Sequence, residues 1–430
     1  MFKTKVPWGI VIALTALAST FSANIIISFG GVRTVLVFVV LGTFFANYRN
    51  DDCPFRVAFR RSMFQNKDIM LLLGWFYVVV VIAAIRGGAG MLVEWKLHAV
   101  SILALFYGFF LQNNPKFHRL SIYIAGVFLV HHALSANQFV SVTGKDMREA
   151  LVEESAALGA TDYWTEFAML SILLACAVIN ERNKIVKVVG FFAVIFLYKT
   201  ILLCGFATPV ALFLIGHSFL GLAFLRFGKS GPFKVLIRLG CALALLAGSF
   251  GAIYKISTME EDERFGSIQI RFKNMLEDPR GGGYDVDNSR FELTKISLGT
   301  FKQNPVFGCG GTYLNNPGSG GHHAFIDYMA IYGLLGGVPF IVFVVLCIMN
   351  SYRRCRQERD WLAFASFACA GIYFIVGLVN PGWLGGPMTA LLLYALPYKS
   401  RPLPSKMQGG GLLKSRNPSV GEPVNVWLQR

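Results

Sequence analysis

The chain alternates between long apolar runs and short polar connectors, and the runs have the length of membrane-spanning helices. About 20 consecutive apolar residues are needed to cross the hydrocarbon core of a bilayer. Twelve runs approach this length, the second and the last being the shortest: 8–28, 32–46, 69–88, 96–111, 120–135, 164–180, 187–203, 208–225, 236–256, 325–350, 361–380 and 383–398. The pattern predicts an all-α polytopic membrane protein with about twelve transmembrane helices.

Two connectors, 136–163 and 257–324, are longer than the others. In the second, glycines at 281–283 and the Gly-rich stretch 315–321 break any long helix. We therefore expect short helices here, one of them covering about 289–303. The apolar residues of that segment predict an amphipathic surface helix and are Phe291, Leu293, Ile296, Leu298 and Phe301.

Composition agrees with this class of protein. Hydrophobic residues make up 54% of the chain and charged residues only 15%, against about 25% in soluble domains. The apolar run after the first five residues is as long as a span and lacks a small-residue cleavage site, so we expect it to be the first anchor. The eight cysteines are scattered without CxxC spacing, which supports neither a disulfide framework nor a zinc site.

The net charge of +16 follows from the distribution of Lys and Arg. If the N-terminus is cytoplasmic, more than half of the 40 basic residues fall in the inside segments, which are 1–7, 47–68, 112–119, 181–186, 226–235, 351–360 and the tail from 399. This is the positive-inside pattern, with both termini cytoplasmic and anionic lipid, not nucleic acid, as the partner of the charge. Residues 1–398 are predicted to form a single transmembrane domain, and the Pro- and Gly-rich segment 399–430 a disordered basic cytoplasmic tail.

Titratable residues gather where the long outer loop enters the tenth span. His322 and His323 stand there, and histidine can accept a proton near neutral pH. Asp327 follows His323 by four residues, so on a helix its carboxylate shares a face with that ring and could orient it. The alternatives are a pair of interfacial anchors, or a metal site for which no further ligand cluster is present.

Cations that could bind phosphate lie in the outer loops and at span ends. Guanidinium groups stay charged and can bind two oxygens at once, although most loop arginines are simply solvated. Arg290 stands out because it opens the segment predicted to be a surface helix. The other candidates are Arg264, Arg271, Arg148, Arg86 and Lys199.

One stretch resembles a known family. It comprises Asn304-Pro305 followed by Gly308, Gly310 and Gly311, then His322, then Gly333-Leu334-Leu335-Gly336, with Arg290 upstream. This order and spacing are similar to the signature of the O-antigen ligase and O-unit (Wzy-type) polysaccharide polymerase superfamily of bacterial envelopes. Two positions depart from it: His323 replaces the expected Asn, and the segment 205–209 replaces a Ser-Arg-Gly element, for which Lys199 could substitute.

The resemblance implies a GT-C-like membrane glycosyltransferase of the bacterial inner membrane, with its active site on the periplasmic face. It implies no metal and no cofactor, with His322 as general base and Arg290 as the catalytic cation. Arg264, Arg271, Arg148, Arg86, Lys199, His323 and Asp327 are the predicted substrate- or diphosphate-binding residues. The expected partners are an undecaprenyl-diphosphate-linked glycan donor, a glycan or lipid A-core acceptor, membrane lipids and a chain-length regulator.

Three functions remain open. Ten residues separate Arg148 from Gly159 and Arg271 from Gly282, a spacing similar to that in polymerase members and one that favours polymerisation of repeat units. The single clear histidine favours the alternative, ligation of polysaccharide to lipid A core. A transporter of polysaccharide or lipid-linked sugar is the alternative from another class, but such proteins place polar residues deep in the bundle.

Overall fold

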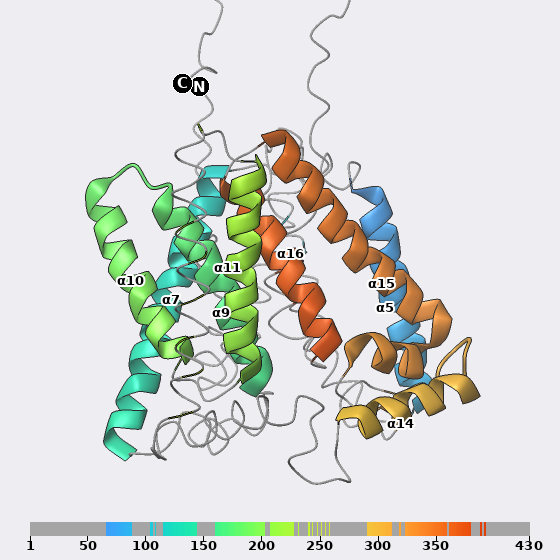
Figure 1. Ribbon diagram of the computed structural model, residues 1–430. Helices are drawn as coiled ribbons and strands as arrows, with labels where there is room; N and C mark the ends of the chain where they lie inside the picture. Colours follow the sequence, from blue (N-terminus) through green and yellow to red (C-terminus); the bar gives the residue numbers. More distant parts are fainter. Residues whose placement is uncertain are drawn as a thin grey trace, which may run out of the picture. The chain divides into compact units, whose positions relative to one another are not determined.

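The computed structural model describes residues 66–87, 115–143, 160–202, 207–227, 290–311, 323–358 and 361–379, together with isolated positions elsewhere. The chain divides into two compact units, Met1–Lys399 and Ser400–Arg430, and every described helix belongs to the first. The regular structure in these ranges is entirely α-helical. It consists of α5 (Lys67–Gly87), α7 (Pro115–Thr143), α9 (Ala160–Ile179), α10 (Lys184–Leu202), α11 (Ala207–Phe227), α14 (Arg290–Gln303), α15 (Ala324–Glu358) and α16 (Trp361–Val379) (Figure 1).

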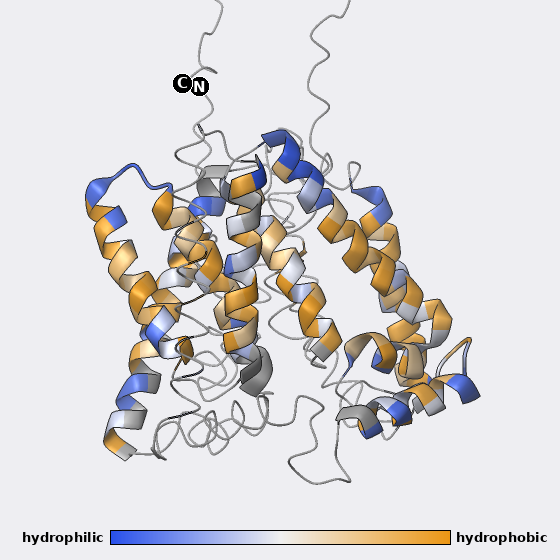
Figure 2. Ribbon diagram, in the orientation of Figure 1, coloured by the Kyte–Doolittle hydropathy of each residue, from blue (hydrophilic) through white to orange (hydrophobic). Residues whose placement is uncertain are grey.

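Four of the described helices, α5, α10, α15 and α16, are long and apolar enough to cross a membrane. Apolar residues run along most of α10 and α15, and hydrophilic residues gather at their ends (Figure 2). The all-helical character is therefore confirmed for the described part of the chain, and the four long apolar helices are compatible with a membrane protein. The predicted spans at 8–28, 32–46, 96–111, 236–256 and 383–398 lie wholly or almost wholly outside the described residues, so the total of twelve stays a prediction.

The predicted boundaries are mostly within a few residues of the observed ones, with two corrections. Helix α7 extends well beyond the predicted 120–135, and α15 continues past 350 to Glu358. In both cases polar residues prolong a helix after its apolar run ends, and hydropathy detects only the apolar part. The surface helix expected near 289–303 is confirmed as α14.

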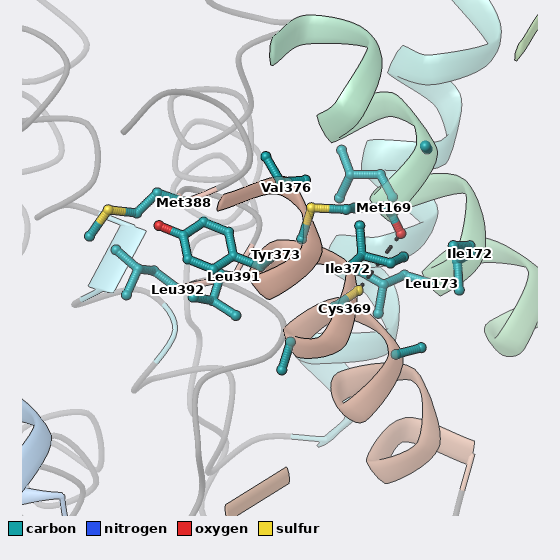
Figure 3. Packing of buried hydrophobic residues seen from close by; sticks show 14 of the residues in the cluster. Met169, Ile172, Leu173, Cys369, Ile372, Tyr373, Val376, Met388, Leu391 and Leu392 are labelled. Atoms are coloured by element: carbon teal, nitrogen blue, oxygen red, sulfur yellow. Dashed lines mark hydrogen bonds between the residues drawn. The ribbon is translucent and has the colours of Figure 1, made fainter. Parts of the chain in front are cut away.

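Helix α9 lies at the centre of one group of helices and packs against α7, α10, α11 and α16. Its residues from Trp164 to Val178 are all buried. Glycines on three neighbours allow this close approach, because an added Cβ would meet a side chain of α9: Gly126 of α7, Gly190 of α10 and Gly216 of α11. At the contact with α16, Met169, Ile172 and Leu173 of α9 pack near Cys369 and Ile372 (Figure 3).

The short connection between α9 and α10 is held by polar side chains. Asn183 caps α10, since its Oδ1 accepts hydrogen bonds from the backbone N–H groups of Ile185 (3.0 Å) and Val186 (3.3 Å). The Glu181 carboxylate accepts a bond of 2.5 Å from the hydroxyl of Tyr123 on α7. These bonds turn the chain sharply, so α9 and α10 form an antiparallel hairpin beside α7.

Helix α15 lies at the centre of a second group and packs against α5, α14 and α16. Gly336 of α15 faces Val79 of α5, and Phe340 lies 4.4 Å from Phe76 between ring centroids. Rising numbers on α15 thus meet falling numbers on α5, so the two helices are antiparallel. The end of α5 and the beginning of α15 therefore lie at the same end of this group, where α14 also lies (Figure 1).

Candidate functional site

Residues 304–311 (NPVFGCGG), called here the Gly-rich turn, connect α14 to the outer loop and lie against α15. Gly308, Gly310 and Gly311 have φ values of 66°, 77° and 94°, in the left-handed region that favours glycine. The helix that the turn meets is itself interrupted, because Gly333 has φ 64° and ψ −167° inside α15. This conformation is almost restricted to glycine, so both sides of the contact depend on residues without a Cβ.

The turn and the interrupted helix exchange backbone hydrogen bonds. In an unbroken helix the N–H groups of residues 334 and 335 would donate to the carbonyls of residues 330 and 331. Here they donate to the turn instead, to Pro305 O (2.8 Å) and Val306 O (3.2 Å). The carbonyls that they leave accept bonds from the turn, Ala330 O from Cys309 N–H (2.9 Å) and Ile331 O from Gly310 N–H (3.0 Å).

These four bonds satisfy two N–H groups and two carbonyls that the break releases. In the absence of water, as in a membrane interior, an unsatisfied backbone N–H or carbonyl costs on the order of several kcal/mol. The contact between the Gly-rich turn and the break at Gly333, called here the turn–break joint, removes that cost. It therefore makes an interrupted helix a stable part of the fold.

Glycines on the two sides of the joint fit against each other without room for a side chain. A Cβ on Gly308 would lie 2.2 Å from Ile331 O, and a Cβ on Gly333 would lie 2.2 Å from Val306 O. The two segments that carry the family resemblance, separated by about 20 residues, thus meet at backbone distance. The resemblance includes both segments, but the sequence did not indicate that they contact each other.

Helix α5 closes the third side of the joint. Gly311 N–H donates to Ala83 O at 2.6 Å, and a Cβ on Gly87 would lie 2.1 Å from Gly311 Cα. Arg86 reaches over the turn, with its guanidinium 3.4 Å from Phe307 O and 5.9 Å from the centre of the Phe307 ring. One of the predicted phosphate-binding cations is therefore fixed directly on the Gly-rich turn while its side chain stays exposed.

Aromatic side chains of α5 and α15 pack on both sides of the break at Gly333. Phe76 of α5 stacks near Tyr328 and Tyr332, which precede the break, and near Phe340, which follows it. The Trp75 indole N–H donates to Leu335 O at 2.8 Å. That carbonyl lacks its usual helical donor because the residue four positions later is Pro339, which has no N–H.

At the start of α15, Asp327 lies fully buried, and both of its carboxylate oxygens accept hydrogen bonds. Oδ1 accepts from the Ser297 hydroxyl (2.5 Å) and Oδ2 from the His323 backbone N–H (3.0 Å). The His323 side chain packs near Phe325, and its buried Nδ1 has no hydrogen-bond partner among the described residues. Asp327 thus bonds to the backbone of His323, whereas the sequence suggested an interaction with its ring.

The buried position of α14 is a polar residue that the apolar pattern did not single out. Ser297 is fully buried, while the apolar residues Ile296 and Leu298 are 46% and 40% exposed. Leu293, Ser297 and Phe301 share one face of the helix at intervals of four, and Leu293 and Phe301 are partly buried. The hydrogen bond from Ser297 to Asp327 explains why a polar side chain is buried in this helix.

The remaining predicted site residues are placed only in part. Arg290 is the first residue of α14, and its side chain is not described. Lys199 is exposed in the last turn of α10, which packs against α7 and α9, away from the group around α15. His322, Arg264, Arg271 and Arg148 lie outside the described residues.

Three features of the site were not predicted from the sequence: the buried Ser297, the indole bond of Trp75 and the positive-φ break at Gly333. Only Trp75 and the break left a signal, namely Pro339 four residues after Leu335 and the glycine pair Gly336–Gly337 near Gly333. Within the described ranges, no group of three or more His, Cys, Asp or Glu side chains is arranged to hold a metal ion.

Comparison with known proteins leaves the resemblance without an independent match. No protein-family model matches the chain. A search of curated proteins likewise finds no relative.

Proposed function

We propose that this chain is a membrane glycosyltransferase that polymerises undecaprenyl-diphosphate-linked oligosaccharide repeat units on the periplasmic face of the bacterial inner membrane. The observation that supports the proposal most is the turn–break joint. The two glycine-containing parts of the motif, 304–311 and 333–336, form one backbone-bonded unit on α15, the helix that follows His322 and His323 in the chain. A motif that folds into one unit at one end of several spanning helices is a reasonable active-site framework.

The reaction requires a base and a cation. The acceptor hydroxyl attacks the anomeric carbon of the donor, a new C–O bond forms, and the bond to the diphosphate breaks. His322 accepts the hydroxyl proton as general base. The leaving undecaprenyl diphosphate carries the negative charge, and Arg290, together with Arg86 on the Gly-rich turn, stabilises it electrostatically.

Two other functions stay as alternatives. Ligation of finished polysaccharide to lipid A core uses the same donor chemistry and the same residues, so only the acceptor differs. A transporter needs no base, and its expected features are polar residues inside the bundle. The partly buried pairs Tyr198–His217, between α10 and α11, and Asn137–Thr200, between α7 and α10, are polar contacts inside the bundle, but each is a hydrogen bond that links two helices.

The proposal is tested in a host in which the chromosomal gene is deleted. His322→Ala and His323→Ala are introduced separately, and the lipopolysaccharide and exopolysaccharide are displayed on gels. We expect His322→Ala to abolish long glycan, a loss of at least about 100-fold for a missing general base. Full restoration of long glycan by His322→Ala would falsify the base assignment.

The lipid product distinguishes the three functions in the same strains. Loss of a polymerase leaves single repeat units on the lipid A core. Loss of a ligase leaves long chains on undecaprenyl diphosphate. If the deletion instead leaves unpolymerised lipid-linked units on the cytoplasmic face, the chain is a transporter and the proposal is wrong.

A further inference from the structure

Asp327 is an ionisable residue held deep in the structure by two separate elements. Its carboxylate is fully buried, which is costly unless both oxygens are hydrogen-bonded. The Ser297 hydroxyl and the His323 backbone N–H supply those two bonds. Ser297 is also fully buried, although it belongs to a surface helix whose neighbouring side chains at 296 and 298 are exposed.

The two bonds have different structural consequences. His323 directly precedes Ala324, the first residue of α15, where backbone donors have no partner within the helix, so Asp327 caps the helix from inside. Its negative charge is also favourable at a helix N-terminus. The bond to Ser297 joins this cap to α14, the helix that begins at Arg290. One side chain therefore connects the element that carries the proposed cation to the residue next to the proposed base.

We propose that Asp327 and Ser297 are positioning residues that fix the entry of α15 and thereby set the location of His323, the residue that follows the proposed base in the chain, relative to α14, an inference that rests on the proposed function. Asp327 does not contact substrate in this proposal, because both of its oxygens are occupied by donors of the protein. This differs from the expectation drawn from the sequence, in which Asp327 bound the substrate or charged a histidine ring.

A positioning role of Asp327 is distinguished from a role of its charge by removing the charge while keeping the shape of the side chain. In Asp327→Asn the amide oxygen can still accept from His323 N–H, and the amide N–H₂ can donate to the Ser297 oxygen. If Asp327 acts by positioning the start of α15, turnover in Asp327→Asn stays within about threefold of wild type. Asp327→Ala breaks both bonds, and we expect turnover to fall by about 10- to 100-fold, as expected for one or two lost buried hydrogen bonds.

Ser297 supplies the matching test on the other helix. Ser297→Ala leaves Asp327 Oδ1 buried without its donor, so we expect turnover to fall by about tenfold, whereas Ser297→Thr keeps the hydroxyl and restores most of it. Ser171→Ala is the control, because Ser171 is equally buried but donates within its own helix, to Phe167 O at 2.8 Å. The control should leave turnover unchanged.

Turnover is measured over pH 5 to 9 with full-length protein in lipid nanodiscs and a lipid-diphosphate-linked donor, and amide hydrogen exchange is measured in the same samples. Ser297→Ala and Asp327→Ala should speed exchange over residues 323–330, while Asp327→Asn should change neither exchange nor the pH profile. A pH profile that shifts in Asp327→Asn, with turnover as low as in Asp327→Ala, overturns the proposal in favour of a charge role. Unchanged exchange in Ser297→Ala also overturns it. The exchange result does not depend on transferase activity, so a failure of the proposed function can be distinguished from a failure of the positioning proposal.

Discussion

Helix α9 and the turn–break joint are both enclosed by other helices, but different atoms hold each in place. Around α9 the contacts are between side chains, with a glycine on each of three neighbours making room for Leu174, Val178 and Ile172. At the joint, the contacts are between backbone N–H and carbonyl groups, and no side chain fits between them. The region around α9 can adjust by moving a methyl group. At the turn–break joint, separating the two segments breaks backbone hydrogen bonds.

The difference bears on function. Side-chain packing tolerates exchange of one apolar residue for another of similar volume. Backbone pairing at the joint fixes the relative position of α14, α15 and the end of α5, which together carry Arg290, His323 and Arg86. A site that must hold a base and cations in a defined geometry gains more from the second kind of contact.

The strongest test of this comparison is Gly333→Ala. Alanine must adopt φ 64° and ψ −167°, and its Cβ would meet Val306 O, so we expect a loss of at least about 3 kcal/mol of unfolding free energy or failure to accumulate. Thermal unfolding of the detergent-solubilised protein measures the effect. Gly308→Ala should behave alike, and the double variant should cost less than the sum, since both substitutions separate the same surfaces.

Two control variants complete this test. Gly74→Ala lies on α5 with nothing near the added Cβ, and it should be neutral or slightly stabilising. Gly190→Ala adds a methyl against the Val178 side chain in the α9 region, and we expect about 1–2 kcal/mol. If Gly190→Ala is as damaging as Gly333→Ala, the proposed difference between the two regions is wrong.

A smaller effect is expected for Trp75→Phe. The substitution removes the N–H that bonds to Leu335 O, at a cost of about 1 kcal/mol. Pro339→Ala supplies a helical N–H to that same carbonyl, so Trp75→Phe should cost less in a Pro339→Ala background. Urea or thermal unfolding of the four proteins gives the coupling, and purely additive effects would show that the indole bond does not compensate for the proline.

The smallest effect is expected for Tyr123→Phe in the α9 region. The Tyr123 hydroxyl, followed by backbone N–H groups, holds the pKa of the partly buried Glu181 carboxyl below its usual value of 4.5. A lowered pKa gives stability that is present above pH 4.5 and is lost as the pH falls through the lowered pKa. Tyr123→Phe should therefore lower the melting temperature by about 1 °C at pH 7, and the difference should be smaller at pH 4. An equal difference at both pH values would attribute the effect to packing.

The sequence was sufficient for those parts of the fold that depend on apolar length. The helices at 67–87, 184–202 and 361–379 agree with predicted spans within three residues because burial in lipid selects apolar runs. It was also sufficient for the existence of α14, which starts one residue after the predicted position. The burial of Ser297 could not be predicted from the apolar pattern of that helix, since it depends on a hydrogen bond to a residue 30 positions away.

The turn–break joint could not be predicted from hydropathy for a related reason. Its bonds join backbone atoms, which are the same in every residue, and only the glycines reveal where they come close. The break at Gly333 lies inside an apolar run that looks continuous, so the run 325–350 was taken as one span. The roles predicted for His322, Arg264, Arg271 and Arg148 stay predictions because these residues lie outside the described part of the chain.

The break at Gly333 also divides the length of α15 with respect to the bilayer. An unbroken helix of 35 residues would extend roughly 52 Å, well beyond a hydrocarbon core of about 30 Å. The apolar part after the break, from Leu334 to Asn350, is about 25 Å long and so nearly matches that thickness by itself. The segment Ala324–Tyr332 is then not needed to cross the hydrocarbon core and can lie at the boundary between the core and water. Under the proposed function, that depth is where the acceptor hydroxyl of a glycan meets the lipid-anchored diphosphate of the donor.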